Sequence, residues 1–217
     1  MKITSQFLVF MIGLTVFSYG IAATIQVQYL GIHPWDVLNV ALFDLFGLTI
    51  GTWAVIVGFL LVIVSFFLDR TYLSVGTFLN ALLIGPMVDL FMYLDYFPKS
   101  STTITDVFVL LFGILLMGIG GGVYSAAGLG AGPRDGFMLS ISDKLGFSIS
   151  RVRIITESAI LVIGWLLGGP VFVFTFIFTF LQSPVYQFFF LTTRKRLEKL
   201  YNHWNPKKEK KYKKATG

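Results

Sequence analysis

Long apolar stretches separated by short polar breaks run along most of the chain, and six of them are long enough to cross a lipid bilayer. A transmembrane helix needs about 20 residues that are mostly apolar. The stretches that meet this requirement are residues 7–29, 50–68, 72–94, 106–127, 152–168 and 170–192. The pattern therefore predicts an all-α membrane protein with six transmembrane helices.

Two shorter segments follow the first and the fourth predicted spans. Residues 34–46 and 133–145 are too short to cross a bilayer, and each opens with a proline, which suits the first turn of a helix. We therefore expect two short half-helices that are either re-entrant or lie at the membrane interface.

The two short segments are related by a shift of 99 positions, which aligns them without gaps. Five of seventeen aligned residues are identical, and the pairs are Pro34 with Pro133, Asp36 with Asp135, Asp44 with Asp143, Gly47 with Gly146, and Ile50 with Ile149. Duplication is the economical explanation. It divides the chain into a first repeat over residues 1–98, a second repeat over residues 99–193 and a basic tail over residues 194–217. Because each repeat has an odd number of spans, we expect the second copy to be inverted relative to the first.

The distribution of basic residues gives an independent prediction of orientation. Cytoplasmic loops of membrane proteins carry an excess of Lys and Arg. With six crossings and a cytoplasmic N-terminus, Lys99 is the basic residue left outside, whereas full crossing by the half-helices would also move Arg70 and Arg134 outside. We therefore expect both termini, and the basic tail, to be cytoplasmic.

Composition excludes several classes of function. The chain has 217 residues, of which 55% are hydrophobic and only 13% charged, and its mean hydropathy is +0.78. Its net charge of +6 gathers at helix ends and in the tail, which disfavours nucleic-acid binding. Cysteine is absent and the two histidines, His33 and His203, are isolated, so we expect no disulfide, metal site or cofactor.

The N-terminal segment has a second interpretation. Lys2, an apolar run and a cluster of small residues are also typical of a signal peptide. The repeat requires this segment as its first helix, so we expect it to be retained.

The half-helix motifs resemble those of a known family. Residues 31–36 read Gly-Ile-His-Pro-Trp-Asp and residues 128–135 read Gly-Leu-Gly-Ala-Gly-Pro-Arg-Asp, and each follows a helix rich in small residues. These motifs resemble the YczE-like (YczE/YyaS/YitT) group of bacterial membrane proteins, over a range from the first helix to the sixth. The resemblance implies a protein of the bacterial cytoplasmic membrane and supplies no catalytic residues. The motif positions that we take as structural are Gly31, Pro34, Gly130, Gly132 and Pro133.

Two paired carboxylates open the half-helices. Asp36 and Asp135 each lie two residues after the proline. A carboxylate there stabilises the helix dipole and binds free backbone N–H groups, which is a structural role. Broken helices between inverted repeats also build the substrate or ion sites of many transporters. Both roles stay open.

Further polar residues extend this candidate site. Asn39 and Asp44 share one side of the first half-helix with Asp36, and Asp143 repeats Asp44 in the copy. On the fifth span, Glu157 is an ionisable residue at membrane depth, and its spacing from Arg153 permits an ion pair. This pair is interpreted either as structural or as part of a proton or ligand site.

The tail begins with an amphipathic pattern. Leu197, Leu200, Tyr201 and Trp204 recur at helical spacing among basic residues, which is typical of a helix lying on a membrane surface. We expect this segment to bind anionic lipid.

The leading hypothesis is a small transporter or permeation unit for a small solute or ion. Its candidate cavity residues are Asp36, Asn39, Asp44, Arg134, Asp135, Asp143, Arg153 and Glu157. The alternative is a non-transporting membrane scaffold or regulatory subunit. An enzyme is disfavoured because the sequence has no nucleophile–base pair or metalloprotease motif. A homodimer is compatible with so small a chain.

Overall fold

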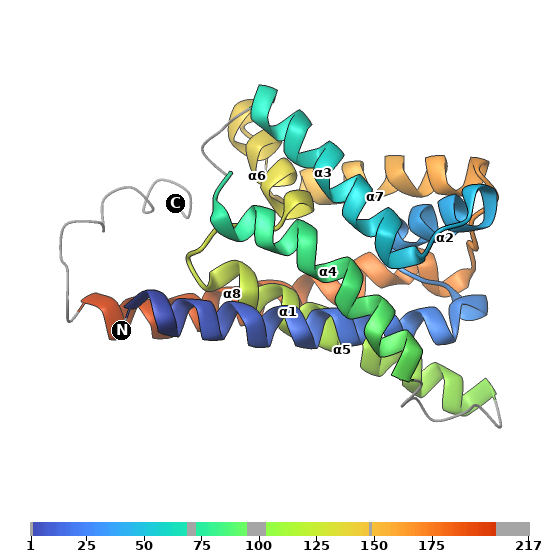
Figure 1. Cartoon of the computed structure of the whole chain (residues 1–217), viewed down its shortest axis with the longest axis horizontal. Coiled ribbons are helices and arrows are strands. Elements are labelled where there is room, and N and C mark those ends of the chain that lie inside the picture. The colour runs from blue at the N-terminus through green and yellow to red at the C-terminus, as the bar shows by residue number, and fades with distance from the viewer. Residues whose placement is uncertain (1, 69–72, 95–102, 148, 203–217) are drawn as a thin grey trace.

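A computed structural model describes residues 2–68, 73–94, 103–147 and 149–202, and every element in these ranges is helical (Figure 1). The elements are α1 (Lys2–Gln26), the 3₁₀ turn η1 (Gln28–Leu30), α2 (Pro34–Phe46), α3 (Ile50–Leu68), α4 (Val75–Leu94), α5 (Thr103–Ala126), α6 (Pro133–Leu145), α7 (Ile149–Leu166) and α8 (Val173–Asn202). The two predicted half-helices are confirmed as helices with the predicted bounds.

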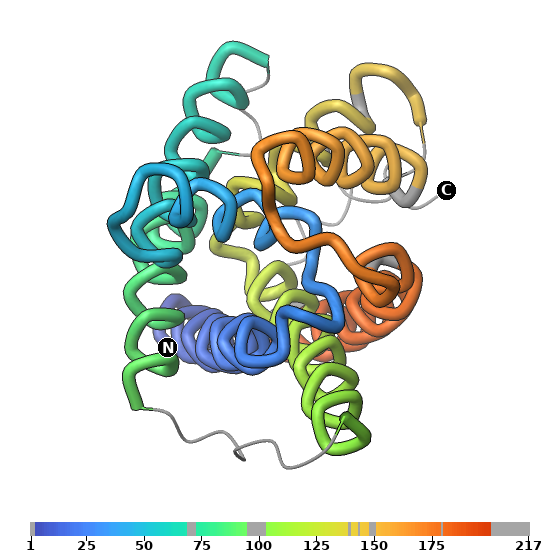
Figure 2. Tube along the Cα trace, turned by 90° about the vertical axis from the view of Figure 1, so that its right-hand side faces the viewer, coloured from blue at the N-terminus to red at the C-terminus, as the bar shows by residue number. Residues whose placement is uncertain are grey.

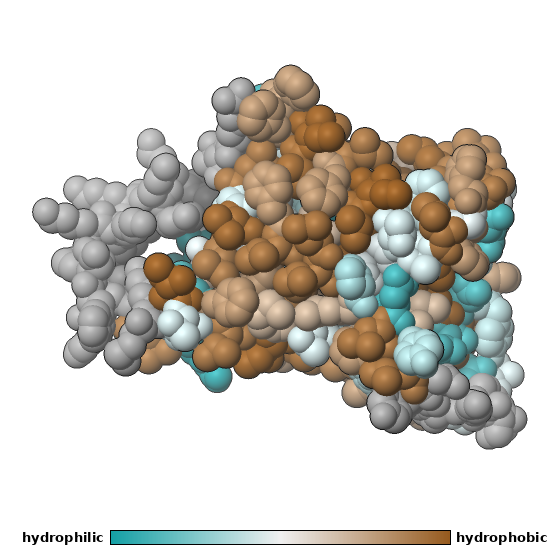
Figure 3. All heavy atoms as spheres, viewed as in Figure 1, coloured by the Kyte–Doolittle hydropathy of each residue, from teal (hydrophilic) through white to brown (hydrophobic). Residues whose placement is uncertain are grey.

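Five helices in the described ranges are long and apolar enough to cross a membrane. They are Ile3–Gln26, Ile50–Leu68, Val75–Leu94, Thr103–Ala126 and Val173–Leu200. Large apolar side chains on these helices face outward, among them Phe108 and Phe180, and apolar residues cover the middle of the face seen in Figure 3. A soluble monomer rarely exposes so much contiguous apolar surface. The chain is therefore a multi-pass membrane protein.

Helix α7, which corresponds to the fifth predicted span, does not belong to this set. Its 18 residues carry Arg151, Arg153 and Glu157. Glu157 is fully buried, with 1% of its surface exposed, so these charges do not all face lipid.

The half-helices α2 and α6 start inside the molecule and run toward opposite ends of its long axis (Figure 1). The first eight residues of α2 are buried, whereas residues 43–46 are exposed. Each half-helix begins at a proline and ends before a glycine with a left-handed backbone, with φ of +72° at Gly47 and +67° at Gly146. Proline at the first position and glycine after the last are the ordinary start and stop signals of a helix.

Helices α1 and α5 cross where glycines of the two helices face each other. A Cβ atom added to Gly20 would lie 2.8 Å from the carbonyl oxygen of Gly113, and one added to Gly120 would lie 2.6 Å from that of Gly13. The early glycine of each helix thus meets the late glycine of the other, so the two helices run antiparallel. Small residues at such a crossing allow the backbones to touch.

The remaining helix contacts come in matched pairs. Helix α1 packs on α4 as α5 packs on α8, and α2 packs on α7 as α3 packs on α6. In the end-on view of Figure 2, α4, α1, α5 and α8 follow one another along one side of the bundle, and α2, α3, α6 and α7 lie on the other. Each of these contacts therefore has a counterpart under exchange of the two halves.

The glycines that precede the half-helices repeat the same geometry. Gly31 and Gly130 have φ of +125° and +123°, values that side chains rarely adopt. Gly31 lies against the start of α8 at Thr175, and Gly130 lies against the start of α4 at Ser74 and Thr77. Each motif glycine thus contacts the last helix of the other half.

The C-terminal segment differs in detail from the sequence-based expectation. A separate amphipathic helix was expected after a span that ends near residue 192, but α8 continues without a break from Val173 to Asn202. No glycine or proline lies between residues 185 and 202 to end it. The rest of the predicted tail, including Trp204, lies outside the described residues.

Candidate functional site

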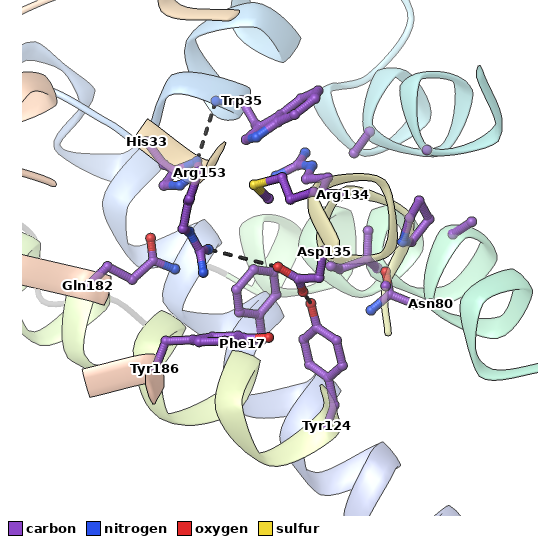
Figure 4. Close-up of a pocket in the computed structure, with 17 residues that line it drawn as sticks. Phe17, His33, Trp35, Asn80, Tyr124, Arg134, Asp135, Arg153, Gln182 and Tyr186 are labelled. Atoms are coloured by element: carbon purple, nitrogen blue, oxygen red, sulfur yellow. Dashed lines mark hydrogen bonds and ion pairs between the residues drawn. The ribbon is translucent and has the colours of Figure 1, made fainter. Parts of the chain in front are cut away.

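A small cavity lies between the N-terminal ends of α2 and α6 (Figure 4). Its volume is about 30 Å³, which is room for roughly two spheres of the size of a water molecule. The polar side chains that line it are His33, Trp35, Asn80, Tyr124, Arg134, Asp135, Arg153, Gln182 and Tyr186. In this conformation the cavity suits an ion or a solute of a few atoms.

Arg153 connects the cavity to helix α7. Its Nε donates a hydrogen bond to Oε1 of Glu157 at 2.8 Å, and its Nη2 lies 3.9 Å from Oδ1 of Asp135. Its guanidinium also lies over the ring of Tyr186, 4.7 Å from the ring centroid. The i,i+4 pair expected from the sequence is therefore present, and it is buried.

Asp135 has partners outside its own helix. Its Oδ2 accepts hydrogen bonds from the hydroxyls of Tyr124 at 2.8 Å and Ser125 at 3.4 Å, both on α5. The residue at the N-cap of α6 is Gly132, and no side chain caps this helix end. In this structure Asp135 thus links α6 to α5 and α7, and its position in the first turn still favours the helix dipole.

Trp35, Asp36 and Arg134 join the two half-helices. Nη1 of Arg134 lies 3.7 Å from Oδ1 of Asp36, and its guanidinium lies over the Trp35 ring, 5.2 Å from the centroid. Asp36 is 1% exposed, so this ion pair is shielded from solvent. Arg134 and Trp35 occupy equivalent positions under the 99-residue shift. The two motifs therefore contact each other through a position at which they differ.

His33 caps α2 and was missed as a site residue. Its Nδ1 accepts a hydrogen bond from the backbone N–H of Trp35 at 3.3 Å, and its Nε2 lies 3.5 Å from Oε1 of Glu157. The ring packs edge-on against Phe178, with a centroid separation of 5.2 Å. Its place immediately before Pro34, the first residue of the half-helix, is a local signal that could have identified it as the N-cap.

Two equivalent positions of the repeats carry side chains of very different size. The 99-residue shift pairs His33 with Gly132 and Glu157 with Gly58. His33 of the first half lies against Glu157 of the second half. The equivalent pair is Gly132 of the second half and Gly58 of the first half, and both of these glycines line the cavity. The open space thus lies where glycines replace a histidine and a glutamate.

Comparison with known proteins identifies the family. Residues 4–191 match a family of unknown function, DUF6198. The chain belongs to DUF6198. The membrane protein YczE of Bacillus subtilis, itself uncharacterised, is 41% identical over 159 residues, which cover 73% of each chain. An uncharacterised protein of Haemophilus influenzae is 34% identical over 164 residues, covering 74% of this chain and 72% of that one. YyaS of Bacillus subtilis is 28% identical over 170 residues, covering 76% and 83%.

These relatives confirm the resemblance to the YczE-like group that the motifs indicated. No solved structure matches this DUF6198 chain.

Five of the eight candidate residues meet in this DUF6198 protein. They are Asp36, Arg134, Asp135, Arg153 and Glu157. Asn39 is buried one turn further along α2 and does not line the cavity. Asp44 is exposed in the last turn of α2, away from the cluster. The side chain of Asp143 lies outside the part of the chain that the structure describes.

No pattern in the sequence identifies several neutral lining residues as part of the site, among them Trp35, Tyr124 and Tyr186. Among the described residues, no group of three or more His, Asp or Glu side chains is arranged to hold a metal ion.

Proposed function

We propose that this protein is a small transporter or permeation unit whose solute or ion binds in the cavity between α2 and α6. The observation that carries the proposal is a cluster of five ionisable side chains, three buried carboxyl groups and two largely enclosed guanidiniums, where two broken helices begin. Ionised residues at membrane depth are costly and usually mark ion or substrate pathways. A buried ion pair adds little stability over apolar side chains of the same size, so fold stability alone gives a weak reason for it.

The helix arrangement supports an inverted repeat, which is the architecture of many secondary transporters. The antiparallel crossing of α1 and α5, and the matched contacts of the two halves, are what two copies in opposite orientations would produce. In this proposal α7 also crosses the membrane, which brings the number of crossings to six. Its 18 residues extend about 27 Å, close to the roughly 30 Å of the hydrocarbon core. Both termini are cytoplasmic, in the cytoplasmic membrane.

Unequal contacts of the two halves support a second conformation. Helix α3 lies against α4 so closely that Gly51 meets the carbonyl of Gly85, whereas the equivalent α7 meets α8 at few positions. Exchanging the conformations of the halves would close α7 on α8 and open α3 from α4. Such an exchange moves access from one side of the membrane to the other while the cavity stays between the half-helices.

Cysteine labelling tests this proposal, because the native chain has no cysteine. Single cysteines replace Asn39 on α2 and Met138 on α6, and impermeant thiol reagents are applied from each side in sodium, potassium or chloride salts and at several pH values. We expect both positions to react from both sides, in proportions that depend on the ions. Labelling of position 39 from outside only, and of position 138 from inside only, under every condition would overturn alternating access and favour the scaffold.

Filling the cavity should block the exchange. Gly58 borders the cavity, and a Cβ atom there would lie 3.8 Å from Pro133. We expect Gly58→Leu to reduce labelling of position 138 from the outside by at least about tenfold, since a leucine side chain exceeds the remaining space. Val64→Phe, which enlarges an outward-facing side chain on the same helix, is the control and should leave labelling unchanged. Equal labelling in both variants would contradict a role for the cavity.

A further inference from the structure

We propose that His33 is the proton-binding group of this site, and that proton uptake at its Nδ1 releases the N-terminal end of α2. The inference rests on the proposed function, for which it names the proton as the ion that drives the conformational exchange. The evidence for it is the pair of contacts made by the two nitrogens of the His33 ring.

The hydrogen bonds of His33 define its tautomer. Nδ1 accepts the backbone N–H of Trp35, so Nδ1 carries no proton in this arrangement. A neutral imidazole must then carry its proton on Nε2, the nitrogen that lies 3.5 Å from the Glu157 carboxylate. The ring, 3% exposed, thus connects the start of α2 to helix α7.

A second proton has opposite effects at the two nitrogens. On Nδ1 it turns the acceptor into a donor, so the N–H of Trp35 loses its partner and the cap of α2 is lost. The positive charge also lies at the positive end of the helix dipole. On the other side, the charged ring gains an electrostatic attraction to the Glu157 carboxylate, 3.5 Å from its Nε2. Proton uptake therefore exchanges a contact within α2 for a stronger contact with α7.

The formal charges around His33 do not balance. Helix α2 and its neighbours α6 and α7 supply three carboxylates and two guanidiniums, namely Asp36, Asp135, Glu157, Arg134 and Arg153. The described cluster thus has one negative charge in excess, which a protonated His33 balances in a medium of low dielectric constant. The nearby phenols, Tyr124 and Tyr186, add no charge near neutral pH.

Release of the N-terminal end of α2 would change the lining of the cavity directly. Trp35 loses its backbone hydrogen bond to His33, and its ring is the surface on which Arg134 of α6 rests. Movement of Trp35 therefore changes the contact between the two half-helices. The second half has Gly132 in place of the histidine, so each chain takes up one proton here.

Nitrogen NMR of the purified protein in detergent tests the proton site without any transport assay. The chain has two histidines, and His203→Asn leaves the signals of His33 alone. We expect the Nε2–H tautomer at high pH and one titration on acidification. A ring that stays neutral from about pH 5 to pH 9, or one that carries its proton on Nδ1 at high pH, would overturn the proposal.

Thiol labelling tests the release of α2. A cysteine at position 39 should react at least about tenfold faster at low pH once the rate is divided by that of a cysteine at exposed position 46. His33→Asn is the matched variant, since asparagine caps helices but binds no proton. Its labelling ratio should not depend on pH, and a ratio that kept the native dependence would overturn the proposal.

The two proposals fail separately. If His33 titrates and releases α2 while position 138 stays accessible from one side only, the transporter fails and the proton site stands. If access alternates with the same pH dependence in His33→Asn as in the native chain, the proton site fails and the transporter stands.

Discussion

Arg153→Met is expected to lower the free energy of unfolding by about 3–5 kcal/mol, because it leaves two buried carboxylates without their cation. Glu157 and Asp135 both face Arg153, and Glu157 is 1% exposed. Methionine has a similar length and an unbranched, flexible side chain, so it removes the charge with little change in volume. Thermal unfolding in one detergent, followed by the fraction of protein that elutes as a monodisperse peak, measures the loss.

The chain offers a matched control on α8. Arg194 and Glu198 form an ion pair with the same i,i+4 spacing and an Nε–Oε1 distance of 3.0 Å, but Glu198 is 52% exposed. Arg194→Met should change stability by no more than about 0.5 kcal/mol, since exposed pairs contribute little. Adding Glu157→Gln to Arg153→Met should restore part of the loss, because one unpaired charge is removed. Equal destabilisation by the two arginine substitutions would contradict the burial of the Arg153 cluster.

The half-helices were predictable because their limits are local. A proline begins each of them and a glycine follows each of them, so short segments of sequence determine where α2 and α6 start and stop. The apolar runs that give the spanning helices are equally local. Charges on α7 weaken its apolar signal, and only the folded structure reveals that Glu157 is enclosed by other helices.

The site was predictable only in part. Helical periodicity predicts which side of a helix a residue lies on, but it does not predict how deeply that residue is buried in the folded protein. Asp36 and Asp44 share one side of α2, yet Asp36 is buried at the inner end and Asp44 is exposed at the outer end. Tyr124 and Tyr186 lie on long apolar helices, where nothing in the sequence distinguishes the side facing α6 from the side facing lipid. Their positions depend on how distant segments pack.

The crossing of α1 and α5 illustrates the same limit and gives the second large prediction. Both helices are visibly rich in small residues, but which glycines meet follows from the crossing geometry. In the structure a Cβ atom on Gly20 would lie 2.8 Å from both the carbonyl oxygen of Gly113 and the backbone nitrogen of Met117. Those are backbone atoms, so relief requires α1 and α5 to move apart.

Gly20→Ala is therefore expected to destabilise the protein by about 1–3 kcal/mol through overpacking. Gly58→Ala is the matched control, because it makes the same change inside α3, where the nearest atom to the added Cβ is the Ala81 Cβ at 3.5 Å. That distance is an ordinary contact, so the higher helix propensity of alanine should leave stability unchanged or raise it by up to about 1 kcal/mol. Thermal unfolding in one detergent compares the two variants. If both shift the midpoint equally, the close backbone approach of α1 and α5 is not what limits residue size at position 20, and the antiparallel crossing that supports the inverted repeat loses its main structural support.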